Sequence, residues 1–308
     1  MGGDKAPAEV VAGIRRYLDQ TQSPSTLHLF GNPEEAKPLL DQHQIPASIM
    51  QLHATTDVIG MQEHPTRALK EKPNSSLAVG FRSLATGEID AFLSAGNTGA
   101  MLVGSLFSIQ PLEGVLRPTM GTIMPKLSGG TGLILDVGLN ADCKPEQLNQ
   151  FAVMGSVYAR HILGIRDPKV GLLNVGEEEG KGNLLAQATY PLLRDNPSIR
   201  FIGNIEGRDL MSDKADVMVC EGFTGNILLK MAESLYDMAQ HQNIQHPFLD
   251  RFHFEHYGGT PVLGVRKPVI VGHGISGSLA FSNMIRLAEQ MLQTDILGKM
   301  AAELSRKE

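Results

Sequence analysis

Five short apolar runs in this sequence each end in a polar turn that contains glycine, and a segment with helical spacing follows each turn. These stretches cover residues 89–100, 133–148, 170–183, 216–230 and 268–281. Repetition of a strand, a glycine-rich turn and a helix is typical of a mostly parallel α/β sheet. The continuous apolar run at residues 217–220 suits a strand with both faces covered. The sequence therefore predicts an α/β fold.

The polar turns of this pattern predict where a ligand binds. In a parallel sheet, the turns between strand and helix lie at the carboxyl ends of the strands, where open α/β folds bind ligands. Each turn also places a helix N-terminus at that edge, and the N–H groups of a helix N-terminus favour anions. We therefore expect an anion-binding site at this edge of the sheet.

Charge, hydropathy and cysteine content exclude several classes of protein. The chain has 27 Lys and Arg against 33 Asp and Glu, a net charge of −6, which argues against a nucleic-acid-binding protein. Apolar runs such as residues 131–137 are far shorter than the ~20 residues of a membrane span. The opening residues lack the pattern of a signal peptide, and two cysteines, Cys143 and Cys220, suit a reducing compartment. We expect a cytoplasmic protein whose cysteines serve in packing.

The sequence predicts a single α/β domain over residues 1–308 with two irregular places. At the start, MGGD and the helical pattern of residues 7–18 form a turn and a helix with no strand before them. We therefore expect a missing first strand of about five to six residues. After a predicted helix at about residues 223–240, an excursion at about 240–256 interrupts the pattern and holds three phenylalanines and several histidines.

Several common motifs are absent from the sequence. No GxGxxG string opens a βαβ unit, and there is no GxxxxGK[ST] loop and no GxSxG elbow, which disfavours dinucleotide binding, P-loop chemistry and serine hydrolysis. The two cysteines stand too far apart for a zinc site.

Read together, the polar turns resemble the bacterial phosphate acyltransferases of the PlsX type. The matching strings follow the chain in order and run over nearly all of it: MGGDKAP, SAGNTGA, LDVGLNADCKPEQL, FAVMGSVYA, GLLNVGEEEGKGN, GNIEGRDL, EGFTGNILLK, YGGTPVLGV and HGISGS. The resemblance implies a three-layer α/β/α fold like that of isocitrate and isopropylmalate dehydrogenases and of phosphotransacetylase, and a homodimer.

The same resemblance implies a reaction. Long-chain acyl-[acyl carrier protein] and inorganic phosphate would give acyl phosphate and free carrier, for phospholipid biosynthesis. A membrane glycerol-3-phosphate acyltransferase would be the partner that consumes the product. No cofactor and no metal are expected.

The chemistry of this reaction selects candidate residues in the matched strings. A phosphate held against a thioester requires backbone N–H groups, Asn and Ser donors, and a cation. The predicted catalytic residues are Lys181, Asn226 and His273. The predicted substrate-binding residues are Gly3, Asp4, Ser94, Asn97, Thr98, Asp136, Asn140 and Asn183.

Each candidate has a structural alternative. Lys181 could be a solvated lysine, Asn226 and the Ser94–Thr98 group could only cap helices, and the Asp136–Asn140 pair could only form a turn. The acidic run at residues 177–179 is either a solvated surface or an orienting partner for Lys181 or Arg208.

The excursion at 240–256 also has two interpretations. The plain one is a shortened loop. In the other, Phe248, Phe252 and Phe254 enter a lipid interface weakly, with Arg251 as the only lysine or arginine of the stretch and histidines that add charge at low pH. A metal site of these histidines is disfavoured.

Two rival functions stay open. A phosphotransacetylase-like enzyme would use short acyl-CoA in place of the carrier protein. A catalytically inactive scaffold would keep the fold and recruit the membrane acyltransferase, although the presence of Lys181, Asn183 and Asn226 counts against it.

Overall fold

A computed structural model describes residues 2–305 of the chain, which divides into two compact units. Unit 1 consists of Met1–Gln110 and Phe254–Gln293, and unit 2 of Pro111–His253 and Thr294–Glu308. Each unit is described by itself below. A single catalytic domain over residues 1–308 therefore stays a prediction, as does a strand before residue 1, which lies outside the described residues.

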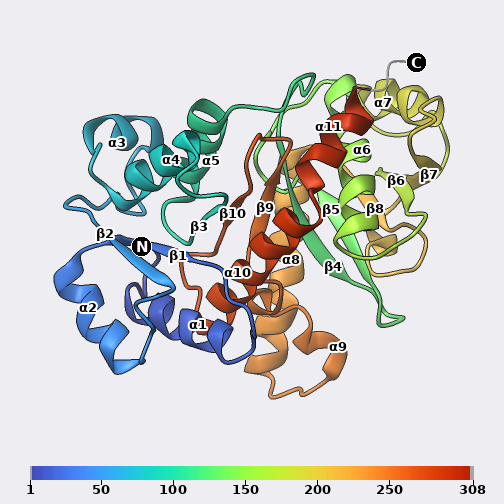
Figure 1. The fold of residues 1–308 in the computed structure, drawn as a ribbon. Coiled ribbons are helices and arrows are strands. Elements are labelled where there is room, and N and C mark those ends of the chain that lie inside the picture. The colour runs from blue at the N-terminus through green and yellow to red at the C-terminus, as the bar shows by residue number, and fades with distance from the viewer. Residues whose placement is uncertain (1, 306–308) are drawn as a thin grey trace. The chain divides into compact units, whose positions relative to one another are not determined.

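Unit 1 combines two small groups of strands with helices (Figure 1). Its elements in chain order are α1 (Ala8–Leu18), β1 (Leu27–Gly31), α2 (Pro33–Gln42), β2 (Met50–Ala54), α3 (Pro65–Glu71), α4 (Ser76–Thr86), β3 (Phe92–Ser94), α5 (Thr98–Gly104), the π-helical turn η1 (Ser105–Ile109), η3 (Phe254–Tyr257), β9 (Thr260–Leu263), β10 (Val269–Val271) and α10 (Ser278–Gln293). Strands β1 and β2 pair in parallel, β3 and β10 pair in parallel, and β10 and β9 pair antiparallel.

The core of unit 1 joins segments from distant parts of the chain. Helices α1 and α10, blue and red in Figure 1, pack against each other. Their apolar positions recur at helical spacing, so that Val11 and Ile14 of α1 and Phe281 and Met284 of α10 are buried. This packing holds the N-terminal turn near the strands of the unit.

Five strands of unit 2 are hydrogen-bonded neighbours in the order β4-β5-β8-β6-β7. Its elements are β4 (Thr119–Pro125), β5 (Thr131–Leu135), α6 (Pro145–His161), β6 (Lys169–Leu173), α7 (Leu184–Arg194), β7 (Arg200–Ile205), η2 (Gly207–Asp209), β8 (Val217–Val219), α8 (Gly222–His241), α9 (Pro247–Asp250) and α11 (Ile296–Leu304). Strands β5, β8, β6 and β7 are mutually parallel, and β4 forms an antiparallel hairpin with β5.

The strand–turn–helix pattern of the sequence is confirmed at all five stretches. They correspond to β3 with α5, β5 with α6, β6 with α7, β8 with α8, and β10 with α10. Val217, Met218 and Val219 of β8 have no exposed surface, because the strand is covered on both faces. The predicted α/β fold with a mixed, mostly parallel sheet is thereby confirmed.

The excursion after α8 is anchored within unit 2. The Arg251 guanidinium donates to the backbone carbonyls of Lys126 at 3.1 Å and Gly130 at 2.5 Å, which belong to the β4–β5 turn. Phe252 is 6% exposed and meets the Phe248 ring edge-on at 5.3 Å between ring centroids. Because this arginine and this phenylalanine already have protein partners, the structure favours a shortened loop over membrane contact. Among residues 2–305, no helix is long and apolar enough to cross a membrane.

Candidate active site

In unit 1, three turns meet at the carboxyl ends of the parallel strands β3 and β10. We call residues 2–5, 94–98 and 272–277 the unit 1 turn cluster. The Gly272 N–H donates to the Ser94 carbonyl at 2.8 Å, and the Asp4 N–H donates to the Gly274 carbonyl at 2.7 Å. Gly3 has a φ of +103°, which suits glycine, and a side chain there would meet the Gly274 carbonyl at 3.1 Å. The predicted residues of unit 1 thus lie on adjoining turns.

Asn97 is committed to structure within this cluster. It caps α5, since its Oδ1 accepts from the Ala100 N–H at 2.9 Å. Its Nδ2 lies 2.9–3.2 Å from the carbonyl oxygens of Gly60, Met61 and Glu63. With 4% exposure and both side-chain ends engaged, Asn97 positions the turn. A direct contact between Asn97 and a substrate stays a prediction. The observed hydrogen bond from the Ala100 N–H supports the alternative, in which Asn97 caps α5.

The other polar residues of the unit 1 turn cluster differ in exposure. The Ser94 hydroxyl is buried and accepts from the Gly96 N–H at 3.1 Å. Thr98, Asp4 and His273 are exposed at the same edge. The His273 imidazole lies at 5.1 Å from the Phe254 ring, centroid to centroid, and is tilted against it.

In unit 2, the turns after the four parallel strands lie at one edge of the sheet. The unit 2 turn cluster comprises residues 136–140 after β5, 174–183 after β6, 206–208 after β7 and 220–226 after β8. The predicted residues Asp136, Asn140, Lys181, Asn183 and Asn226 all belong to this cluster. The parallel order of the strands, rather than nearness in sequence, brings them to one edge.

Asp136 organises the first of these turns. Its buried carboxylate accepts from the N–H groups of Gly138 (2.8 Å), Leu139 (2.9 Å) and Asn140 (3.1 Å), and from Asn140 Nδ2 (2.6 Å). Burial raises the pKa of the Asp136 carboxyl, and these hydrogen bonds oppose that effect. Asn140 Nδ2 also donates to the Pro118 carbonyl at 2.8 Å. Turn formation therefore accounts for the observed contacts of both side chains.

Helix α8 docks onto this turn through its first residues. Asn226 is exposed, and its Nδ2 donates to the Val137 carbonyl at 3.1 Å. The helix cap is Glu221, whose Oε1 accepts from the Thr224 N–H at 3.1 Å, so Asn226 is not the cap. Sequence reasoning missed Glu221, although a carboxylate directly before a helix is a recognisable N-terminal signal.

Gly225 sets how closely α8 approaches the turn. A Cβ atom at this position would lie 1.8 Å from the Asp136 carbonyl oxygen. We expect Gly225→Ala to lower the free energy of unfolding by about 1–3 kcal/mol, because α8 must move away from the turn. Chemical denaturation measures this loss. The matched control is Gly180→Ala, where an added Cβ meets nothing within 4 Å and should change the free energy by less than ~0.5 kcal/mol. Equal stability of the two variants would contradict the close packing.

Asn183 and Lys181 follow β6. Asn183 caps α7, since its Oδ1 accepts from the Ala186 N–H at 2.8 Å. Lys181 is exposed, and among the described residues its ammonium group has no hydrogen-bond or ion-pair partner in the unit. The lysine is therefore available to a ligand.

The acidic run beside Lys181 has other partners than the sequence suggested. Glu177 pairs with Lys214 at 2.6 Å, and Glu179 pairs with Arg194 at 2.8 Å. Arg208 pairs with Glu206. The observed ion pairs of the run are thus with Lys214 and with Arg194 of α7, and none of them supports an orienting role toward Lys181 or Arg208.

A cavity of about 340 Å³ opens within the unit 2 turn cluster. Its polar lining comes from two turns, after β6 and after β8, and consists of Asn174, Asn183, Glu221 and Thr224, together with apolar residues such as Leu148 and Leu228. Sequence reasoning named only Asn183 among these four. Asn174 carries the plainest missed signal, an Asn directly after a buried strand; its Oδ1 accepts from the Val175 N–H at 2.8 Å.

The two cysteines do not form a nucleophilic site. Burial, with Asp136 and Glu221 nearby, raises the pKa of the Cys143 thiol to about 12, and burial also raises the pKa of Cys220. A thiol with such a pKa is protonated at neutral pH and is a poor nucleophile. We expect Cys143→Ala to keep activity within about twofold, and iodoacetamide at pH 8 to alkylate Cys143 at least ~10-fold more slowly than free cysteine. Rapid inactivation by alkylation of Cys143 would contradict this.

One group of side chains in unit 1 has the composition of a metal site. Ligand atoms of His28, His53 and Glu88 lie within 4.8 Å of one another. However, His28 Nδ1 and His53 Nε2 are 2.9 Å apart with stacked rings, so they satisfy each other by a hydrogen bond. Burial and the neighbouring His53 lower the pKa of His28. The two imidazole rings therefore have a hydrogen-bond partner in each other without a metal ion.

Known proteins are similar in sequence to almost the whole of this chain. A family model described as "Fatty acid synthesis protein" matches residues 1–246. The phosphate acyltransferase of Desulfitobacterium hafniense (strain DSM 10664 / DCB-2) is 42% identical over 326 residues, covering 99% of this chain and 96% of that protein. The phosphate acyltransferase of Halothermothrix orenii is 38% identical, covering 99% of this chain and 97% of that protein.

Solved structures share the fold at low sequence identity. A phosphotransacetylase from Streptococcus pyogenes has a TM-score of 0.67 at 17% identity, covering 94% of this chain and 92% of that one. A branched-chain phosphotransacylase from Enterococcus faecalis V583 has a TM-score of 0.62 at 16% identity, covering 94% and 96%. These likenesses confirm the phosphotransacetylase-like fold. The family match and the relatives with 38–42% identity over almost the whole chain show that this chain belongs to the phosphate acyltransferases of the fatty acid synthesis family.

Proposed function

We propose that this enzyme transfers a long-chain acyl group from the thioester of acyl carrier protein to inorganic phosphate. A phosphate oxygen attacks the thioester carbonyl, the C–S bond breaks, and acyl phosphate and the carrier thiol leave. The observation that carries this proposal is Lys181: an exposed lysine with no described partner, at the sheet edge where the turns after four parallel strands lie. The relatives named phosphate acyltransferase support the same reaction.

Each candidate residue has a proposed task. In unit 2, Lys181 neutralises phosphate, and Asn226 and Asn183 border the same sheet edge as hydrogen-bonding groups. In unit 1, the exposed His273 is the proposed acid that protonates the departing thiolate, and Gly3, Asp4, Ser94 and Thr98 border the turn edge there. Asn97, Asp136 and Asn140 are positioning residues in this proposal, because their side chains hold the turns.

The reaction does not need a covalent enzyme intermediate. Holding phosphate and thioester together supplies a large part of the rate by proximity alone. Donors aimed at the tetrahedral oxyanion supply a further ~3–4 kcal/mol each in comparable acyl transfers. The raised thiol pKa values of Cys143 and Cys220 support direct attack by phosphate.

The remaining partners belong to the same proposal. We infer a cytoplasmic homodimer that reaches the inner face of the membrane only through its partner, a membrane glycerol-3-phosphate acyltransferase that consumes acyl phosphate. Co-purification with that enzyme, tested with and without detergent, distinguishes such a partner from direct lipid binding.

The test is phosphate-dependent breakdown of palmitoyl-carrier protein by the purified chain, with acyl phosphate trapped by hydroxylamine as the hydroxamate. We expect a signal that requires both protein and phosphate. Activity with short acyl-CoA but not with the carrier thioester would favour the phosphotransacetylase-like rival. Absence of activity with both donors in a folded protein would favour the inactive scaffold.

A further inference from the structure

The cavity of about 340 Å³ in the unit 2 turn cluster has mostly apolar walls. They come from three helices and a strand, and include Leu148 of α6, Leu172 of β6, Ala186 of α7 and Leu228 of α8. Walls of this kind attract a ligand by removing its apolar surface from water. The cavity therefore favours a hydrocarbon group over an ion.

The polar residues of the lining already serve the turns to which they belong. Asn174 uses both ends of its amide, since Oδ1 accepts a backbone N–H at 2.8 Å and Nδ2 donates to the Lys181 carbonyl at 3.1 Å. Asn183 and Glu221 accept backbone N–H groups of the helices that they cap, at 2.8 Å and 3.1 Å. The Thr224 hydroxyl donates to the Glu221 carboxylate. Because of these bonds, the cavity selects a ligand chiefly by its apolar surface.

The cavity lies directly beside the proposed phosphate-binding lysine. Gly182 and Asn183, the two residues that follow Lys181 in the chain, both line it. The Glu221 carboxylate in the lining repels an anion. Phosphate is thus expected at Lys181 outside the cavity, and an uncharged part of the other substrate inside it.

The size of the cavity suits a long hydrocarbon chain. An apolar cavity of ~150 Å³ takes a benzene molecule, so about 340 Å³ has room for roughly twelve carbon atoms. Val175, which lines the cavity, is 80% exposed, and Leu184, between the lining residues Asn183 and Leu185, is 86% exposed. These two side chains give a longer chain apolar surface outside the cavity.

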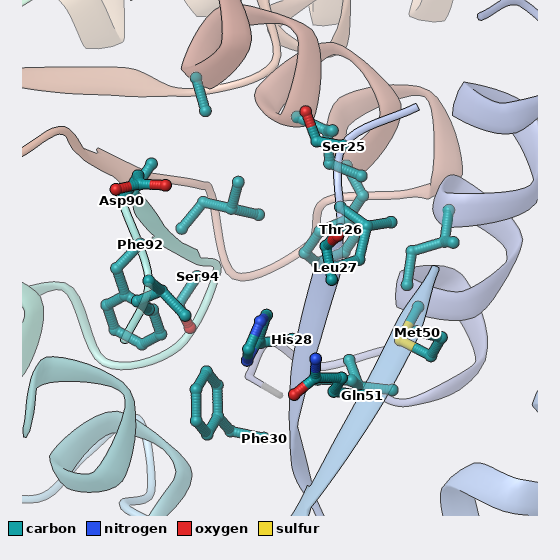
Figure 2. A pocket seen from close by; sticks show the side chains of 18 of the residues that line it. Ser25, Thr26, Leu27, His28, Phe30, Met50, Gln51, Asp90, Phe92 and Ser94 are labelled. Carbon is teal, nitrogen blue, oxygen red and sulfur yellow. The ribbon is translucent and has the colours of Figure 1, made fainter. Parts of the chain in front are cut away.

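A larger cavity in unit 1 is a poorer match for such a chain. It has a volume of about 750 Å³ and lies between β1 and β3 (Figure 2). Its lining includes the polar side chains of His28, Gln51 and Asp90, which Figure 2 labels. A hydrocarbon chain would take such groups out of water without offering them hydrogen bonds, which costs free energy.

We propose that the 340 Å³ cavity of unit 2 is the subsite for the acyl chain, with Ala186 and Leu228 among the residues that limit the length of chain it encloses. The carbonyl end of the chain lies at the opening beside Lys181, and roughly the first twelve carbons lie inside. This inference rests on the proposed function, because it assigns a subsite to a substrate of that reaction.

The experiment measures binding of carrier protein whose thiol carries an alkyl group through a thioether, which has no acyl group to transfer. Isothermal titration gives the affinity for a series from butyl to hexadecyl. Ala186→Leu adds three carbons to the cavity wall, and Leu228→Ala enlarges the cavity from α8. The matched control is Ala188→Leu, the same change at an exposed position of α7 that does not line the cavity.

We expect the affinity of the parent chain to rise by about tenfold or more from butyl to dodecyl carrier. The rise should shrink to less than about threefold in Ala186→Leu and stay as in the parent in Ala188→Leu. In Leu228→Ala, the chain length at which affinity stops rising should increase by about two carbons or more. Should Ala186→Leu fail to fold, Leu228→Ala decides the matter. Affinity independent of chain length in the parent, or the same length dependence in the parent and the cavity variants, would overturn the proposal.

The hydroxamate assay on the same proteins keeps this inference separate from the proposed function. A length dependence of binding that the cavity variants alter, in a chain that makes no acyl phosphate, would contradict the reaction and support the subsite. Production of acyl phosphate with a binding profile that neither cavity variant alters would support the reaction and overturn the subsite.

Discussion

Lys181→Ala is expected to lower the rate of phosphate-dependent acyl transfer by about 100-fold or more while leaving the protein equally stable. The lysine is exposed and has no described partner, so its removal breaks no contact that holds the fold. The loss should appear in kcat/KM for phosphate, because the ammonium group neutralises the attacking anion and the developing oxyanion. The hydroxamate assay and a denaturation curve on the same protein measure both quantities.

Two further variants separate charge from position at this site. Lys181→Arg keeps the positive charge and should retain more activity than Lys181→Ala, although its planar guanidinium differs in shape from an ammonium. Lys70→Ala removes an exposed lysine on α3 and should keep activity within about twofold. Activity of Lys181→Ala within about threefold of the parent would remove this lysine from the proposed mechanism.

Asp216→Ala is expected to lower the free energy of unfolding by about 3–5 kcal/mol. Lys126 and Asp216 are 3% and 8% exposed, and Nζ lies 2.5 Å from Oδ1. The other carboxylate oxygen accepts from the Lys169 N–H at 2.9 Å, so the aspartate also holds the start of β6. Among residues 2–305, the alanine leaves the buried ammonium group with only the more distant Asp213 carboxylate, at 3.9 Å. Urea denaturation measures the loss.

The controls test whether burial makes this pair costly to break. Asp167→Ala removes the partner of Arg200 in an exposed pair of the same unit, with the two side chains 65% and 55% exposed, and should cost less than ~1 kcal/mol. The double variant Lys126→Met/Asp216→Leu should recover most of the stability lost in Asp216→Ala, because no unpaired charge stays buried. Similar losses in Asp216→Ala and Asp167→Ala would contradict a role for burial.

The fold was predictable because its signals are local. Strand β8 is a run of apolar residues, and the turn and α8 follow within the next few positions, so periodicity alone identifies all three. The antiparallel strands β4 and β9 were not predicted, since neither belongs to the repeated pattern. The division into two units also escaped prediction, because unit 1 joins Met1–Gln110 with Phe254–Gln293 across the whole intervening unit.

The residue types of the candidate site were predictable from the sequence. The role of each residue was less predictable. Polar residues after each strand had to reach one edge of the sheet, because parallel strands place their carboxyl ends together. Whether Asn97 binds a ligand or a loop depends on the carbonyl groups at residues 60–63, which no local pattern reveals. The ion-pair partners of the acidic run were not predicted for the same reason, since Lys214 precedes β8 and Arg194 ends α7.

By itself, the sequence of this chain determined the order of strands, turns and helices and the family to which they belong. Spacing and residue type decide these properties within a few positions of the chain. Only the tertiary structure decided that Asn97 binds the carbonyl groups of residues 60–63, that Lys181 is left without a described partner, and that β1 and β3 face each other across a cavity. Those outcomes depend on groups far apart in the sequence, and folding brings such groups together through the packing of whole elements.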